Sequence, residues 1–165
     1  MTNTPGPHGP KVKYPYKGDV QWAFLKWADI ESAIYPGYTY LRRLRIFQTP
    51  WFALYLHFIF EPDLDRDPHD HPCNFWSLIL RGGYFERVYM NIRNLFYNDY
   101  RTRRRFTVAK MPITWAHRIE ELKPGTITLC WFGARQRRWG FWTDLGFVPA
   151  QDYARTSNVQ DAFGA

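Results

Sequence analysis

The sequence predicts an all-β domain of the sandwich or jelly-roll class, with one amphipathic helix close to its amino terminus. Aromatic residues, which favour strands, make up 19% of the 165 residues: eight Trp, eleven Tyr and thirteen Phe. Twelve Pro and eleven Gly supply turns, and short runs of strand-forming residues recur at regular spacing. The length suits one ordinary domain, and a 45% hydrophobic fraction is sufficient for a core.

The amino-terminal part is expected to contain a loose arm followed by the helix. Residues 1–18 are rich in Pro, Gly and Lys and show no periodicity. In residues 19–34 apolar side chains recur every three or four positions, Asp19 is a candidate N-cap, and Pro36-Gly37 ends the pattern. The predicted division of the chain is therefore a flexible arm (1–18), a single domain (19–155) and a flexible tail (156–165).

After the helix the periodicity becomes that of strands separated by turn-rich segments. The Gly82-Gly83 pair between two of these segments is a signal for a two-residue hairpin. The expected strands are 38–47, 51–60, 75–81, 84–92, 104–110, 116–120, 126–132 and 138–143.

Basic residues exceed acidic ones by 22 to 15, a net charge of +7, and sixteen of the basic residues are Arg. Ten of these Arg fall in three clusters, within 42–45, 101–105 and 135–138. Clustered charge attracts anions, so we expect a small acidic molecule as the ligand. Solvated strand faces would give the same pattern, and nucleic acid is a less favoured partner because no nucleic-acid motif is present.

Membrane and secreted classes are not favoured. No apolar run approaches the roughly 18 residues of a membrane span. The first fifteen residues hold no apolar segment of the kind a secretory signal needs. Cys73 and Cys130 are too few for a disulfide framework, which favours a cytoplasmic protein with reduced thiols.

The segment His69-Asp70-His71 is the first candidate site. In an extended chain residues two apart point to the same side, so both imidazoles can converge on one point. Neutral imidazole binds Fe, Zn, Ni and Cu well. The pair alone is a weak signal, since two histidines that cap a loop together with Asp67 and Asp70 would match it equally.

The surroundings of this pair resemble the first motif of the cupin superfamily, H-x-H, three or four residues, E, six residues, G. Here His71 is followed after four residues by Trp76 and after six more by Gly83. The likeness spans roughly residues 50–145, and segments such as HDHP, SLILRGGYFE and WGFWTDLGFVP look like those of small cupin-like proteins of bacteria and phages.

The second cupin motif, P-x-G-x-x-H-x-x-x-N, is similar to Pro112-x-Thr114-x-x-His117-x-x-x-Glu121. The resemblance implies a jelly-roll barrel in which His69, His71 and His117 hold a metal. Trp76 stands at the glutamate position and cannot coordinate, which leaves three histidines, as in the cysteine dioxygenase-like cupins. The cofactor implied is one divalent transition metal, with Fe(II) favoured over Zn, Ni or Mn.

Strand alternation predicts further residues of the cavity. If Trp76 occupies the position of the glutamate ligand in the cupin motif, it points inward and makes the floor of the cavity apolar and narrow. Arg104 shares the parity of Phe106 and Val108, so we expect it at the cavity mouth, where it would bind a carboxylate or phosphate. His57 is expected either to extend the site or to have a structural role.

The sequence therefore predicts a metal-binding cupin-like protein, with a three-His oxygenase or isomerase acting on a small acidic molecule as the leading function. The alternative is a non-catalytic cupin that binds a nucleotide or other ligand, or serves as a phage accessory protein, because replacing a ligand is also how cupins lose their metal. A homodimer is expected from the resemblance to small cupins, and the aromatic excess suits it.

Overall fold

Alternating apolar and polar residues shape most of the chain into strands that bury one face. The computed structural model describes residues 22–31, 37–63, 67–92 and 95–153. In these residues the strands form two six-stranded sheets with antiparallel pairing. The first contains, in spatial order, β1 (Ala23–Glu31), β2 (Thr39–Gln48), β3 (Ala53–Ile59), β10 (Thr126–Phe132), β5 (Phe75–Arg81) and β8 (Val108–Met111). The second contains β12 (Gly146–Pro149), β11 (Gly140–Thr143), β4 (His69–Asp70), β9 (Trp115–Leu122), β6 (Gly83–Ile92) and β7 (Leu95–Arg104).

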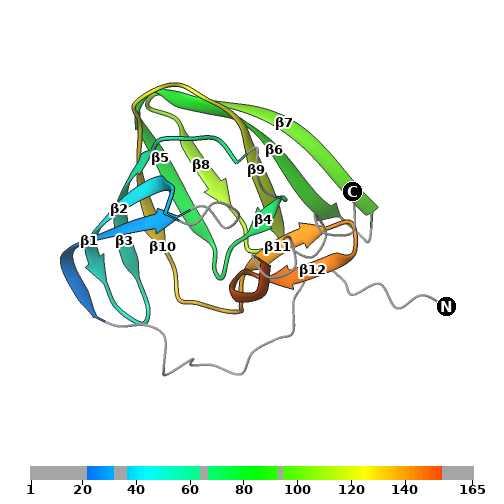
Figure 1. The fold of residues 1–165 in the computed structure, drawn as a ribbon, viewed down its shortest axis with the longest axis horizontal. Helices are drawn as coiled ribbons and strands as arrows, with labels where there is room; N and C mark the ends of the chain where they lie inside the picture. Colours follow the sequence, from blue (N-terminus) through cyan, green and yellow to red (C-terminus); the bar gives the residue numbers. More distant parts are fainter. Residues whose placement is uncertain (1–21, 32–36, 64–66, 93–94, 154–165) are drawn as a thin grey trace.

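The two sheets confirm the all-β prediction, and Figure 1 shows them as the two sides of the molecule. Burial alternates along β5 and β10, as expected for strands with one face against a core. An apolar cluster contributed by both sheets fills one part of the interior. Its buried members are Leu41, Ile59, Ile79, Tyr84 and Ile119.

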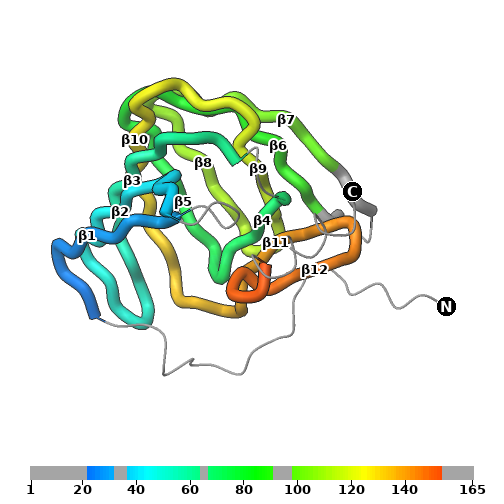
Figure 2. Tube along the Cα trace, viewed as in Figure 1, coloured from blue at the N-terminus to red at the C-terminus, as the bar shows by residue number. Residues whose placement is uncertain are grey.

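The predicted amino-terminal helix is wrong: the described part of that segment, residues 23–31, is the edge strand β1, beside β2 in Figure 2. Its pairing includes a bidentate contact in which Arg42 Nε and Nη2 donate to the Asp29 carboxylate at 2.7 and 3.0 Å. A helix of this length is only marginally stable alone, whereas the open edge of β2 satisfies the backbone directly. Several aromatic side chains of β1 are exposed, including Phe24 and Trp27.

The Gly82-Gly83 pair is not a hairpin turn, because β5 and β6 belong to different sheets. Both glycines have positive φ angles, 71° and 140°. A Cβ on Gly82 would collide with Thr126 Oγ1, and one on Gly83 would collide with the Arg103 carbonyl oxygen. The pair therefore forms a tightly packed corner that carries the chain from one sheet to the other.

Besides β1, three strands were not expected, β4, β7 and β12, and β8 begins at Val108 instead of at residue 104. A turn at Phe106, where φ is 64°, separates β7 from β8. Residues 150–153 form a short helical turn whose Tyr153 stacks on Phe141. No helix among the described residues is long and apolar enough to cross a membrane. The predicted arm and tail, 1–18 and 156–165, lie outside those residues.

Candidate metal centre and its cavity

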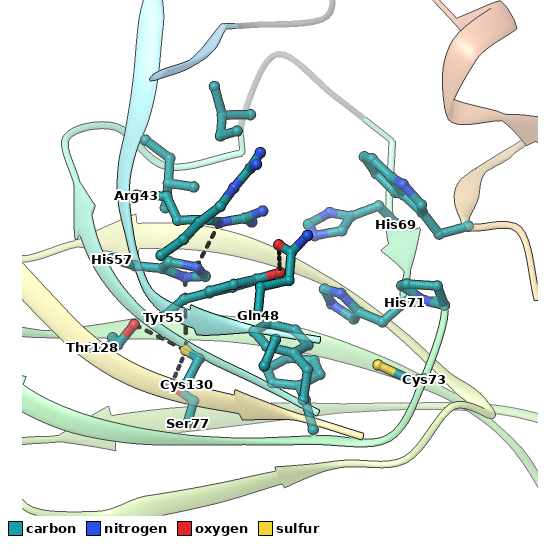
Figure 3. Close-up of a pocket in the computed structure, with 18 of the residues that line it drawn as sticks. Arg43, Gln48, Tyr55, His57, His69, His71, Cys73, Ser77, Thr128 and Cys130 are labelled. Carbon is teal, nitrogen blue, oxygen red and sulfur yellow. Dashed lines mark hydrogen bonds between the residues drawn. The ribbon is translucent and has the colours of Figure 1, made fainter. Parts of the chain in front are cut away.

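Between the sheets lies a cavity of about 580 Å³, a size that suits a small molecule. Figure 3 shows Arg43 and His57 on one side of it, His69 and His71 on the other, and Tyr55 and Gln48 between them. The first side comes from the sheet of β2 and β3, and the second from β4 and the chain that follows it.

Strand pairing brings three predicted histidines together. His69 on β4 lies directly opposite His117 on β9, and His71 follows two residues after His69 on the same side of the chain. One nitrogen of each of the three rings lies within 4.8 Å of the others. The Nε2 atoms of His71 and His117 are 3.0 Å apart. His71 and His117, which are 46 positions apart in the sequence, thus become neighbours through the β4–β9 register.

This cluster has the chemistry of a metal site. Two imidazole nitrogens that each lie about 2.1 Å from one ion, at roughly a right angle, are about 3.0 Å apart, which matches His71 and His117. Burial lowers the pKa of His71 well below its usual value, and the nearby His117 and Arg137 lower it further. His71 is therefore neutral, and the neutral form is the one that binds a metal.

Glu86 on β6 fixes the orientation of His117. The carboxyl is fully buried, its Oε2 lies 2.6 Å from His117 Nδ1, and its Oε1 accepts from Arg103 Nε at 2.6 Å. Burial favours a higher pKa for Glu86, but His117 and Arg103 outweigh burial and lower the pKa. An ionised carboxylate only accepts, so His117 donates from Nδ1 to Glu86, and its Nε2 faces His71.

Asp63 and Asp70 support β4 from two sides. Asp63 Oδ2 lies 3.9 Å from His69 Nδ1 and accepts a hydrogen bond from the backbone N–H of Ile119. Asp70 points away from the two histidines, as strand alternation requires. Its carboxylate accepts from Gly140 N and Trp142 Nε1, both at 3.0 Å, and pairs with Arg137 Nη1 at 2.7 Å.

The opposite side of the cavity is cationic. Arg43 on β2 pairs with His57 on β3, and its Nε donates to His57 Nε2 at 2.9 Å. The pKa of His57 is held well below its usual value by burial and by the charge of Arg43. His57 is therefore neutral with its proton on Nδ1, which faces Cys130 Sγ at 3.7 Å. His57 lines the cavity, but its Nε2 is occupied by Arg43.

The structure places Trp76 on the outer face of β5, which corrects the inward orientation expected from the motif. Trp76 stacks on Trp131 outside the cavity, and the buried, cavity-lining residues of β5 are Phe75 and Ser77. The inward position that follows the histidine pair therefore lies after three residues, not four. Phe75 occupies it and packs against His71, with ring centroids 4.4 Å apart.

Arg104 is exposed and does not line the cavity, because the parity assumed for it is reversed. Phe106 and Val108, expected inside, are 69% and 56% exposed, and Arg103 is the neighbour that reaches inward to Glu86. The turn at residue 106 interrupts the single strand on which that parity was counted. The error follows from one irregular residue.

Sequence reasoning left Glu86 unoriented and did not place Arg43 at the site. Glu86 alternates with Tyr84 and Val88, and all three are buried, but a parity alone does not say which face of a strand is inside. Arg43 was visible only as a member of an Arg cluster. Its place opposite His57 depends on the β2–β3 register, which no local pattern reveals.

Comparison with known proteins finds no matching family and no match among curated proteins. Solved structures do match. An oxalate decarboxylase from Lactobacillus farciminis has a TM-score of 0.49 at 16% identity, over 86% of this chain and 39% of its own. KdgF from a Halomonas species has a TM-score of 0.46 at 16% identity, over 69% of this chain and 96% of its own.

A cupin-2 domain protein from Rhodospirillum rubrum is similar over almost the whole domain. Its TM-score is 0.52 at 14% identity, and the match covers 85% of this chain and 86% of that one. Identity this low shows the fold and not the activity. The two facing antiparallel sheets are thus arranged as in a cupin, and this chain has the cupin fold.

Proposed function

We propose that His69, His71 and His117 hold one divalent transition metal, and that the protein is a metal-dependent enzyme acting on a small acidic molecule. The observation that carries this proposal is the convergence of three imidazole nitrogens at the wall of a cavity. The Glu86 contact that turns His117 Nε2 toward His71 supports it, because a ligand histidine is normally oriented by a partner at its other nitrogen.

Fe(II) is the ion we propose, and Zn, Ni and Mn are the other ions that a nitrogen-rich site accepts. An ion held by three neutral ligands keeps its full charge, so the chemistry it would supply is polarisation of a bound group and a place for substrate to bind. The side chains of this protein contribute the rest. Glu86 holds the His117 proton at Nδ1, and Phe75 and Trp139 limit water around the histidines.

The proposed reaction class is oxygenation or isomerisation. A cationic wall with Arg43 and Arg45 opposite the histidines supports an acidic substrate, since it would neutralise substrate charge within a partly apolar cavity. This assignment replaces Arg104, whose side chain lies outside.

Metal analysis is the test of the proposal. Protein stripped with chelator and reloaded with Fe(II), Zn(II), Ni(II) or Mn(II) should bind about one ion per chain. His69→Ala and His71→Ala should each abolish tight binding, and His57→Ala is the matched control that removes a cavity histidine outside the cluster. Binding that survives both cluster substitutions, or is lost equally in the control, would contradict the proposal.

A non-catalytic ligand-binding protein is the second candidate, and Phe75 favours it. Its ring fills the inward position beside His71, so no carboxylate ligand is available there. Dioxygen consumption and product analysis with the Fe(II)-loaded protein and a panel of small acids would separate the candidates. Tight acid binding without turnover across the panel would favour the second one.

The homodimer, the nucleic-acid partner and the cytoplasmic location stay predictions. Sedimentation at high protein concentration tests the first, and a monomer would contradict it. A steep loss of DNA or RNA binding with added salt, at useful affinity, would support the second.

A further inference from the structure

The charge around the cavity is strongly uneven. Among the described residues, three Arg line the cavity and one Asp does. The Asp is Asp63, which lies beside His69 on the histidine side. Arg43 and Arg45 lie together on the opposite side, on the same face of β2, because they are two residues apart in a strand. The cavity therefore has one side with the histidine cluster and Asp63, where Arg135 lies near Cys73, and one side where two guanidinium groups lie together.

Arg43 has no carboxylate partner among the described residues. Its Nε donates to the neutral ring of His57, and its guanidinium carbon lies 4.8 Å from the centre of the Tyr55 ring. Neither contact neutralises the charge. Burial lowers the pKa of Arg43, which shows that this environment disfavours a charged group. A guanidinium in such surroundings gains most from an anion that comes from outside the chain.

Arg45 is a second guanidinium that could bind an anion in the cavity. Its Nε is buried and has no hydrogen-bond partner among the described residues, and its side chain also lines the cavity. Arg45 pairs with Tyr55 across the β2–β3 ladder, and Tyr55 donates to Gln48 Oε1 at 2.5 Å. The Tyr55 ring thus contacts the Arg43 guanidinium, and its hydroxyl is fixed by Gln48.

The space between the two sides is lined by aromatic rings that contact one another. Phe132 lies 5.1 Å from Tyr55 and 4.8 Å from Phe75 between ring centroids, and Phe75 in turn contacts His71. A molecule that reaches from the arginines to the histidines would therefore lie along an apolar, aromatic wall.

We propose that Arg43 and Arg45 form a carboxylate subsite, which holds a small molecule with a carboxylate at one end, an apolar or planar middle, and a donor group directed at the histidines. Two N–H groups on one planar guanidinium edge match the two oxygens of a carboxylate. His57 is a positioning residue for Arg43, because it fixes the Nε edge and leaves the terminal nitrogens for the ligand. The orientation toward the histidines rests on the proposed function, whereas the carboxylate subsite does not.

Calorimetric titration of metal-free protein with acetate, benzoate and 3-phenylpropionate tests the subsite, with benzamide and 3-phenylpropionamide as neutral counterparts. We expect the aromatic acids to bind more tightly than acetate and at least about tenfold more tightly than their amides, as charge-assisted hydrogen bonds require. Arg43→Gln and Arg45→Gln should each weaken acid binding by about tenfold or more. Arg104→Gln, which removes an exposed Arg of the same charge, should leave it unchanged.

Two further measurements keep the result interpretable. Circular dichroism shows whether Arg43→Gln folds normally. Arg43→Lys retains the charge, so it should bind the acids more tightly than Arg43→Gln does, and it replaces that variant if Arg43→Gln folds poorly. Equal affinity for acids and amides, or equal weakening in Arg104→Gln, would overturn the subsite. Because the titration uses metal-free protein, loss of metal binding in the cluster variants leaves this result unaffected, and the two proposals fail separately.

Discussion

His117 and His57 lie at opposite sides of one cavity, and their hydrogen-bond partners have opposite charge. His117 donates from Nδ1 to the carboxylate of Glu86, and its Nε2 is directed at His71. His57 accepts at Nε2 from Arg43 and turns Nδ1 toward Cys130. Both rings are buried, and both belong to strands that line the cavity.

The hydrogen-bond partner on the far side of each histidine ring therefore decides which kind of ligand the ring can bind in the cavity. An anionic acceptor behind the ring leaves a lone pair for a cation. A cationic donor consumes that lone pair and makes the ring a support for the guanidinium. Two regions built from the same residue type thus suit ligands of opposite charge.

The largest expected effect separates the two histidines directly. Loss of a residue that supports a metal ligand weakens metal binding by about 10- to 100-fold. His117→Ala should weaken it by more than this, because the variant removes a ligand atom itself. His57→Ala should leave metal affinity within a few-fold of the parent. Competition with a chromophoric chelator measures both constants, and equal losses would remove the distinction between the two regions.

The next effect concerns the carboxylate behind His117. Glu86→Leu should weaken metal binding by about 10- to 100-fold, because the His117 ring loses its orienting acceptor. It should also destabilise the fold by about 3–5 kcal/mol, since Arg103 keeps a buried charge without its partner. Glu86→Gln retains an acceptor oxygen and should have a smaller effect on the metal. Glu120→Gln, on the neighbouring strand, is the control, and metal affinity that does not change in Glu86→Leu would contradict the role.

A pH effect of intermediate size is expected from the other region. The pKa of His57 is lowered in the folded state by burial and Arg43, so the unfolded chain binds the proton more readily. The corresponding stability is complete above the unfolded pKa, near 6.5, and is lost as the pH falls from that value down through the folded pKa. Each such group contributes a slope of about 1.4 kcal/mol per pH unit in that window.

Urea unfolding of metal-free protein between about pH 7.5 and about pH 5 measures this slope. His57→Gln, which keeps a polar group beside Arg43, should make it shallower by the contribution of one group. A slope that is the same in the variant and the parent would show that His57 is charged in the folded protein or does not titrate differently on unfolding.

The smallest effect is expected outside the cavity. Trp76→Leu should cost about 1 kcal/mol through loss of the stacked contact with Trp131, and it should change neither metal affinity nor carboxylate binding. Thermal unfolding and the two binding assays measure this. A marked loss of metal binding would mean that Trp76 belongs to the site after all.

Local patterns were sufficient for several elements of the fold. The predicted strands 75–81 and 126–132 have the same bounds as β5 and β10, because both have clear alternation and turns at their ends. The spacing over 19–34 predicted a helix, but the aromatic residues in this segment also favour strands. There the free edge of β2 decided the outcome, and no local signal describes that edge.

For the site, the sequence alone determined the spacing that puts His69 and His71 on one side of the chain, since two-residue alternation is a property of any extended backbone. The motif resemblance then pointed to His117. Tertiary structure decided the rest: the β4–β9 register that closes the cluster, the Phe75 that replaces Trp76 inside, and the carboxylate or guanidinium behind each ring. These depend on pairing between distant strands, which local sequence patterns do not describe.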